Sequence, residues 1–278
     1  MSTGTEQVTL PELRLVAATH RIPQGTQFYG LYARELLRTF RNPWVLVITV
    51  VQPFMWLAFF GSSFSAAPSS LVFGLFGTTS YIAFLLPGVL STSMLSVGMF
   101  GSMSTIQDKR FGYMKRILLT PTGKSTVFLA KALGSATRGL VQIPVMIVAA
   151  LAFGVHFSGD PLMWAGWVLG LVLLGLGFSA MFLAVTASST DWQTPGVISN
   201  FITMPLMFAS TALFPSANFP VWMRTISEFN PVTYSALFGR GIILSGNADW
   251  LYLGYLGIFA AIMVALGTLV AARYLRVE

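Results

Sequence analysis

The chain has 278 residues, of which 55% are hydrophobic and only 9% are charged. Soluble domains are about 25% charged, so this composition excludes an ordinary soluble globular protein. The sequence contains no cysteine, which excludes disulfides and thiolate metal sites, and its net charge of +7 comes from bases beside apolar runs. That arrangement indicates a membrane surface as the partner, and not nucleic acid.

Residues 1–27 are expected to form a polar cytoplasmic tail, and residues 28–278 a single transmembrane domain. A helix between Phe28 and Arg41 would carry aromatic and leucine side chains on one side and an arginine stripe, with Arg34 and Arg38, on the other. This pattern predicts an amphipathic helix on the inner leaflet, with its arginines near anionic headgroups. Two interpretations stay open: a plain membrane anchor, or an anchor that also offers a docking surface.

Six apolar runs follow, each close to the roughly 20 residues that a helix needs to cross a bilayer. Pro87 and Pro205 are expected to kink the second and fifth runs within a helix bundle. The sequence therefore predicts an all-α integral membrane protein with six transmembrane helices. The expected spans are 43–61, 81–105, 128–155, 162–187, 194–214 and 251–274.

The distribution of bases predicts the orientation of these spans. Five arginines precede the first run and six bases lie between the second run and the first turn of the third, whereas only Arg224 and Arg240 lie between the fifth and sixth. Lysine and arginine gather in the cytoplasmic loops of membrane proteins. We therefore expect both termini in the cytoplasm and the chain in the cell inner or plasma membrane.

The stretch QDKRFGYMKRILLTPTGKST, residues 107–126, ends like a phosphate-binding loop. That loop needs a glycine separated by four residues from its Gly-Lys pair, so that backbone N–H groups can point at phosphate. Leu118 stands at that position, and no buried strand precedes it. We therefore expect no ATP site and no bound cofactor in this chain.

The same stretch predicts a short helix over residues 108–119. Thr120 precedes Pro121, and the residue before a proline avoids the α region. The apolar flank and the bases of this helix lie on opposite sides, and Gly112 offers a flat spot for close approach. It is either a solvated loop that carries orienting positive charge, or an amphipathic helix that fits a cleft on a soluble ATPase.

The apolar runs carry no recognisable catalytic or ion-coupling group. All nine acids and both histidines lie outside the apolar interiors. Ion-coupled carriers and intramembrane enzymes usually place such groups inside the bilayer. The sequence also has no metal-ligand pair and no serine nucleophile motif, so we expect neither a metal site nor enzymatic activity. Sodium coupling through backbone carbonyls stays open.

Residues 215–250 are too apolar for an ordinary loop and too interrupted by proline and glycine to cross a membrane. Backbone that does not span but lies at membrane depth has to pack against protein or water. Two short re-entrant helices in the outer leaflet satisfy this condition. An interfacial cap with Trp222 and Trp250 as belt residues satisfies it as well.

Arg138 lies in the third run, about 10 Å beyond Lys131, where a charge costs a few kcal/mol. Snorkelling or a bond to a neighbouring helix would explain it, and so would a role in holding a substrate headgroup or gating a cavity. Methionine and phenylalanine side chains in the runs offer either an adaptable substrate pathway or ordinary packing. The pathway candidates beside Arg138 are Met94, Phe201, Met204, Met207 and Phe208.

Two stretches resemble the signature of ABC-type-2 transporter permeases. The first is Asp108-Lys-Arg-x-Gly112, then Lys115-Arg-x-Leu-Leu-x-Pro-Thr122, then Lys131. The second is FPSANFPVWMRTISEFNPVTYSALFGRGIIL, with Asn230-Pro-x-Thr-Tyr234 ahead of Arg240. The likeness covers nearly the whole chain and is strongest to the drug-resistance and lipid-exporting branch, which includes daunorubicin-resistance permeases.

This resemblance implies that the permease pairs with a second copy or a related permease on two copies of a cytoplasmic ABC ATPase, which binds the ATP and magnesium. Residues 108–119 would be the coupling helix, and residues 215–250 the outer gate. The residues implied for ATPase coupling are Arg34, Arg38, Asp108, Arg110, Gly112, Lys115, Arg116, Leu118 and Pro121. Those implied for the outer gate are Pro215, Pro220, Asn230, Pro231, Thr233, Tyr234 and Arg240.

These features together predict the permease subunit of an ATP-driven exporter. It would move an amphipathic drug, lipid or glycolipid from the inner leaflet outward, with the ATPase, a second permease and membrane lipids as partners and no nucleic acid. Two other functions stay open. One is a membrane scaffold or assembly subunit that transports nothing, and the other is an ion-coupled secondary carrier.

Overall fold

The computed structural model describes residues 23–65, 67–120, 122–157, 160–189, 191 and 193–274. Within these residues every regular element is a helix and no β-strand is present, which confirms the predicted all-α fold. Most of the predicted N-terminal tail lies outside the described residues, and its boundary at residue 27 stays a prediction.

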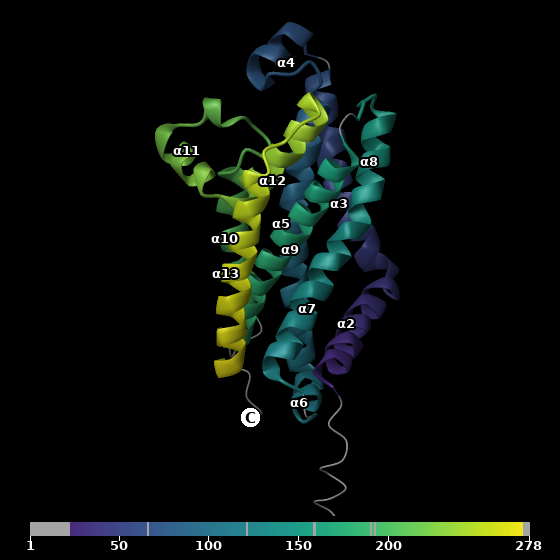
Figure 1. The fold of residues 1–278 in the computed structure, drawn as a ribbon, viewed down its shortest axis with the longest axis vertical. Helices are drawn as coiled ribbons and strands as arrows, with labels where there is room; N and C mark the ends of the chain where they lie inside the picture. Colours follow the sequence, from purple (N-terminus) through teal and green to yellow (C-terminus); the bar gives the residue numbers. More distant parts are fainter. Residues whose placement is uncertain are drawn as a thin grey trace, which may run out of the picture.

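Five helical segments are long and apolar enough to cross a membrane, and they confirm five of the predicted spans as long apolar helices. Figure 1 shows them running along the long axis of the molecule. They are α3 (Pro43–Ser65), α5 (Tyr81–Arg110), the joined α7 (Lys124–Arg138), η1 (Gly139–Val141) and α8 (Gln142–Ala152), α9 (Pro161–Ser188) and α13 (Leu251–Tyr274).

The run predicted as the fifth span, 194–214, is helical only over its first part. There α10 (Thr194–Phe208) has 15 residues, and the chain leaves the helix at Ala209. Fifteen residues rise about 22 Å, less than the roughly 30 Å apolar thickness of a bilayer. The count of six transmembrane helices therefore stays a prediction, because the described residues contain five that meet the length.

Short helices lie at both ends of the bundle (Figure 1). At the lower end are α2 (Gln24–Phe40) and α6 (Tyr113–Leu118). At the upper end are α4 (Ser69–Phe76), η2 (Ser216–Asn218), α11 (Val221–Glu228), α12 (Pro231–Arg240) and the π-helical η3 (Gly241–Ser245). Helix α4 is not among the predicted elements. Its buried Phe76 ring lies 4.5 Å from that of Tyr81 and 5.2 Å from that of Phe84, measured between centroids.

The core lies between α5 and α9, and α13 packs on α9. Trp167 and Phe182 of α9 are fully buried. The backbones of α5 and α9 touch at Gly98, where an added Cβ would lie 2.9 Å from the carbonyl carbon of Phe178. A glycine on α5 therefore lets the two long helices approach closely, as small residues do in membrane bundles.

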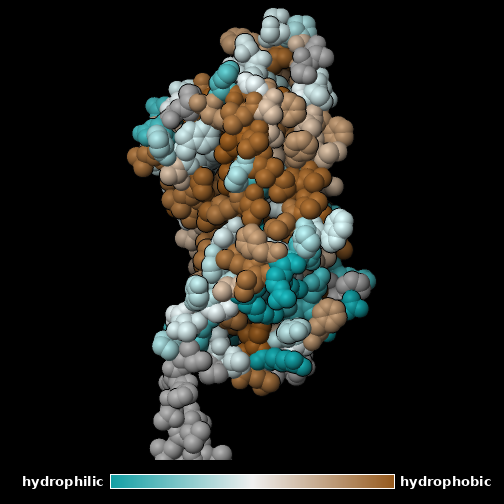
Figure 2. Space-filling view, turned by 90° about the vertical axis from the view of Figure 1, so that its right-hand side faces the viewer, coloured by the Kyte–Doolittle hydropathy of each residue, from teal (hydrophilic) through white to brown (hydrophobic). Residues whose placement is uncertain are grey.

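The surface carries the apolar belt of a membrane protein. Figure 2 shows hydrophobic residues across the middle of one face and hydrophilic ones gathered near its lower end. Large apolar side chains are exposed on α3, α10 and α13, for example Trp44, Phe201 and Leu269. So much exposed apolar surface would be unfavourable in water, and a bilayer or a partner chain covers it in a multi-pass membrane protein.

Candidate functional site

A cluster of charged side chains lies where α2, the end of α5 and α7 meet. The Lys131 ammonium on α7 is at its centre, 2.5 Å from Asp108 Oδ2 of α5 and 3.0 Å from Glu35 Oε1 of α2. Asp108 and Lys131 are both buried. One buried cation therefore holds the carboxylates of two other helices, and these residues with Arg34 and Arg38 are called the charge cluster below.

Two arginines of α2 complete the charge cluster. Arg38 Nη1 donates to Asp108 Oδ1 at 3.0 Å, and Arg34 Nη2 lies 3.6 Å from the same oxygen. The other nitrogen of Arg38 donates to Gln107 Oε1 at 2.9 Å. The expected position of these arginines near lipid headgroups stays a prediction, since both side chains are more than a third exposed. Their contacts with α5 are an addition to it, because a buried carboxylate that lacks cations carries a large desolvation cost.

Lys109 connects the same end of α5 to the C-terminus of α9. Its ammonium donates to the carbonyl oxygens of Thr186 at 2.6 Å, Ala187 at 3.2 Å and Ser189 at 3.3 Å. The last carbonyls of a helix have no partner within the helix, and a lysine at that end also suits the helix dipole. Two consecutive residues, Asp108 and Lys109, thus attach α5 to three neighbouring helices.

The stretch predicted as one helix over residues 108–119 is divided in two. The long α5 continues to Arg110, and α6 begins at Tyr113 after a turn. Gly112 forms that turn with φ of 72°, a left-handed conformation that only glycine adopts without strain. No atom lies within 4 Å of an added Cβ on Gly112, so its backbone angle is the structural reason for glycine here.

The tip formed by the turn and α6 exposes apolar side chains beside bases. Phe111 is 70% exposed and Leu119 is 74% exposed, and Arg116 is exposed as well. The tip also contacts α2, because the Arg34 guanidinium lies 5.6 Å from the ring centroid of Tyr113. The side chains of Lys115 and Leu118, and all of Pro121, lie outside the described residues.

At the other end of the molecule, Asn230 joins α12 to the end of α10. Its Oδ1 accepts the N–H of Val232 at 3.0 Å and caps α12, which begins at Pro231. Its Nδ2 donates to the carbonyls of Leu206 at 2.7 Å and Ala209 at 3.2 Å. The amide thus satisfies one N–H and two carbonyls where helices end, which explains an asparagine before the proline.

Arg240 holds the non-helical segment that follows α10. This buried guanidinium donates to the carbonyls of Thr211 at 2.5 Å and Ala212 at 2.8 Å. Its Nε donates to Phe84 O at 2.9 Å, and its carbon lies 3.5 Å from the centroid of the Phe84 ring. The distribution of bases predicts a loop position for Arg240, but the side chain lies inside the protein and bonds carbonyls of a non-helical segment.

The remaining outer-gate candidates shape the same region. Pro215 and Pro220 directly precede η2 and α11. A backbone N–H at the start of a helix has no acceptor within that helix, so a proline, which lacks the N–H, costs nothing there. The Thr233 hydroxyl accepts the Thr211 N–H at 3.2 Å, and the Tyr234 hydroxyl donates to the carbonyl of Glu228. Asn230, Thr233 and Arg240 thus form one hydrogen-bonded unit around the break after α10, and Tyr234 bonds α12 to the end of α11.

Comparison with known proteins agrees with this architecture. A family model described as ABC-2 type transporter matches residues 26–244, from α2 to η3. The chain belongs to the ABC-2 type transporter family. It is 30% identical over 224 residues to the putative transport permease ycf38 of Porphyra purpurea, covering 80% of this chain and 74% of that protein. It is 24% identical over 256 residues to the daunorubicin resistance ABC transporter permease protein DrrB1 of Streptomyces coeruleorubidus, covering 90% and 88%.

Family membership makes this ABC-2 type chain a transport permease. Glu35 and Lys131 are not among the site residues predicted from the sequence. Two features of the sequence indicate them. Glu35 lies in the arginine-rich helix, and Lys131, seven positions beyond Lys124, ends the first motif that resembles the permease family.

The pathway candidates of this ABC-2 type permease separate into two groups. Met94 and Arg138 lie inside the bundle. Phe201, Met204 and Phe208 are exposed on α10. A cavity of about 180 Å³ between α3, α5 and α10 is lined by Met204 and Met207 among others. The six residues therefore do not line one space, and their role as a pathway stays a prediction.

Proposed function

We propose that the chain is the permease subunit of an ATP-driven exporter powered by a separate cytoplasmic ABC ATPase. The observation that carries this proposal is the charge cluster, because it joins α2, α7 and the end of α5 directly ahead of α6. A force applied to α6 would therefore move these helices together, whereas the same force would only bend a loop that lacked such contacts. Such a connection suits a transporter whose energy comes from a separate subunit.

The tip at α6 is the proposed docking element for the ATPase. Exposed Phe111 and Leu119 beside Arg116 offer an apolar wedge with a basic flank, which fits a cleft in a soluble partner. Two permeases, as a homodimer or a heterodimer, would sit on two ATPase copies. The ATPase would hold ATP and magnesium, and this chain would bind neither.

We propose that the end of the molecule with α2, α6 and the C-terminal end of α13 faces the cytoplasm. The bases cluster there, and positive charge favours the cytoplasmic side. On this orientation α4, α11 and α12 lie toward the outside (Figure 1). The unit around Asn230 and Arg240 is then the proposed outer gate, and α11 and α12 are the re-entrant helices.

The proposed cargo is an amphipathic drug, lipid or glycolipid taken from the inner leaflet. The apolar face of α10, with the cavity beside Met204 and Met207, supports an apolar path. The likeness to a permease named for daunorubicin resistance supports the drug class.

The test is reconstitution of the purified permease in proteoliposomes with and without an ABC ATPase from the same organism. We expect no ATP binding by the permease alone, and lipid- or drug-stimulated hydrolysis with outward transport only in the complex. Tight ATP binding by the isolated chain would contradict the proposal. Solute movement driven by a sodium or proton gradient without ATPase would indicate a secondary carrier, and assembly without any transport would indicate a scaffold.

A further inference from the structure

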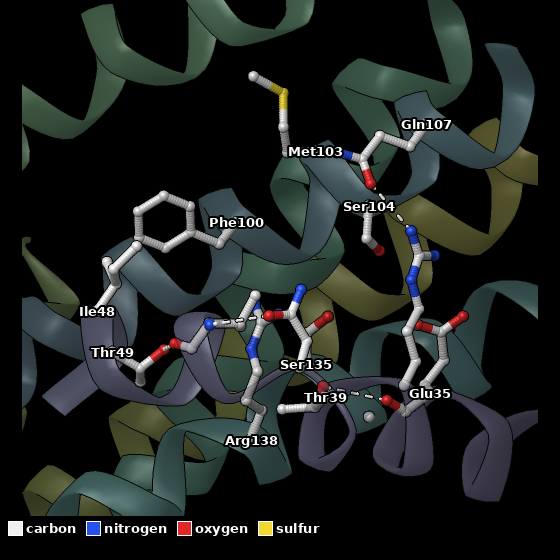
Figure 3. Close-up of a pocket in the computed structure, with 14 residues that line it drawn as sticks. Glu35, Thr39, Ile48, Thr49, Phe100, Met103, Ser104, Gln107, Ser135 and Arg138 are labelled. Carbon is white, nitrogen blue, oxygen red and sulfur yellow. Dashed lines mark hydrogen bonds between the residues drawn. The ribbon is translucent and has the colours of Figure 1, made fainter.

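A cavity of about 250 Å³ lies between α2 and α3 on one side and α5 and α7 on the other. Figure 3 shows the side chains that surround it. One part of its wall is apolar, formed by Ile48, Phe100 and Met103. Another part carries hydroxyl groups and charges, with Thr49, Ser135 and Arg138. A space with these two kinds of wall suits an amphiphile better than water or a purely apolar molecule.

Arg138 is the least satisfied charged group at this cavity. It is 8% exposed, and its Nη2 donates to the carbonyl of Val97 at 3.0 Å. Its Nε is buried and has no hydrogen-bond partner. No carboxylate of the described residues lies within ion-pair distance of it, and the Glu35 carboxylate at the cavity is bound by Lys131. A buried guanidinium without an ion pair is costly, so an anion in the cavity would stabilise it.

The charge cluster beside the cavity does not supply that anion. Its three bases, Arg34, Arg38 and Lys131, share two acids, Glu35 and Asp108. The cluster therefore keeps one positive charge in excess, and Arg138 adds a second. Electrostatic attraction is strong where protein and membrane replace water, so this excess positive charge favours an anionic occupant.

We infer that the cavity binds an anionic amphiphile. A phosphate or carboxylate headgroup would lie against Arg138 and Arg38, whose planar guanidinium groups match such oxygens, and its hydrocarbon tail would lie along Ile48, Phe100 and Met103. Two sources share this chemistry: a resident anionic phospholipid of the inner leaflet, and the cargo itself. The cargo case rests on the proposed export function, whereas the resident-lipid case does not.

The experiment measures ligand binding to the purified full-length chain in a neutral detergent. The probes are dioctanoyl phosphatidylglycerol, dioctanoyl phosphatidylcholine with the same tails, and inorganic phosphate, with binding followed by native mass spectrometry and by thermal stabilisation. We expect phosphatidylglycerol to bind at least about tenfold more tightly than phosphatidylcholine, because it gains a charge-assisted hydrogen bond. Inorganic phosphate should bind more weakly than phosphatidylglycerol, because it has no tail.

Three variants locate the binding. Arg138→Gln removes the charge and should weaken phosphatidylglycerol binding roughly tenfold or more. Ser104→Phe fills the cavity without changing any charge and should weaken it as well, which keeps the test valid if the first variant does not fold. Arg273→Gln removes an exposed arginine at the end of α13, outside the cavity, and should leave binding unchanged.

Equal binding of the two lipids, or unchanged binding in both cavity variants, would overturn the inference. Phosphate that matches phosphatidylglycerol would overturn the part that concerns the tail. The source is then decided in proteoliposomes with the ATPase. ATP-dependent movement of labelled phosphatidylglycerol to the outer leaflet makes it cargo, and its retention makes it a resident lipid. If no transport occurs while phosphatidylglycerol binding is intact, the export proposal is wrong and the binding inference stands.

Discussion

Lys131 Nζ lies 2.5 Å from Asp108 Oδ2 and 3.0 Å from Glu35 Oε1, so a single buried ammonium joins α7 to α5 and to α2. Asp108 precedes the turn to α6 by only a few residues, which places this contact directly behind the proposed docking element. The contact connects α2 with the tip that is the proposed docking element.

Replacing Lys131 with methionine should destabilise the protein, because two carboxylates lose their shared cation. Removal of one partner of a buried ion pair costs about 3–5 kcal/mol, and we expect the lower end because Asp108 keeps its arginines. Thermal unfolding in detergent, followed by tryptophan fluorescence, measures the loss. Lys124→Met is the matched control, since that ammonium makes one exposed bond to the Ala272 carbonyl. An equal effect of both variants would show that the charge cluster has no special role.

Gly112→Ala should impair coupling while leaving the spans intact. The left-handed backbone at Gly112 costs a residue with a side chain about 1–2 kcal/mol, so alanine should shift the turn and the position of α6. The expected result is normal membrane insertion with reduced ATPase stimulation in the reconstituted complex. Gly123→Ala is the control, because Gly123 has a φ of −63° that alanine adopts freely. Unchanged stimulation by Gly112→Ala would remove the turn from the coupling proposal.

The sequence predicted the long helices well because about 20 consecutive apolar residues leave few alternatives to a buried or spanning helix. It predicted the charge cluster less well. Arg38 and Asp108 are 70 positions apart, and Glu35 and Lys131 are 96 apart, so no periodicity connects them. Arg240 shows the same limit. A count of bases places it in an outer loop, whereas its burial depends on carbonyls freed by the break after α10.

Gly88→Ala should disrupt the contact between α5 and the segment after α10. An added Cβ would lie 2.0 Å from the carbonyl oxygen of Ala212, which is backbone and cannot rotate away. Overpacking of this kind costs about 1–3 kcal/mol or more in unfolding free energy. Gly257→Ala on α13 meets no atom within 4 Å and should be neutral or stabilising, since alanine is the better helix former. Thermal unfolding of the two variants should therefore shift in opposite directions or by clearly different amounts.

Arg240→Lys should destabilise the outer unit even though the charge is kept. The guanidinium reaches the Phe84 carbonyl with Nε and the Thr211 and Ala212 carbonyls with Nη2, and a single ammonium cannot reproduce that spread. We expect a lower unfolding temperature and faster proteolysis between α10 and α12. Arg224→Lys is the control, because Arg224 bonds the Ser216 and Ala217 carbonyls at the exposed surface. If Arg240→Lys behaves like this control, the guanidinium geometry is not what holds the segment.

Cysteine labelling tests the outer gate, and no native thiol competes because the sequence has no cysteine. Asn247→Cys is exposed after η3 and should react rapidly with an impermeant maleimide added from outside. Ser235→Cys is fully buried in α12 and should react slowly. If the gate moves, trapping ATP on the partner ATPase should change the rate at Ile226→Cys, which lies on the exposed face of α11. Equal, rapid labelling at all three positions would mean a solvated loop, since backbone packed at membrane depth excludes the reagent.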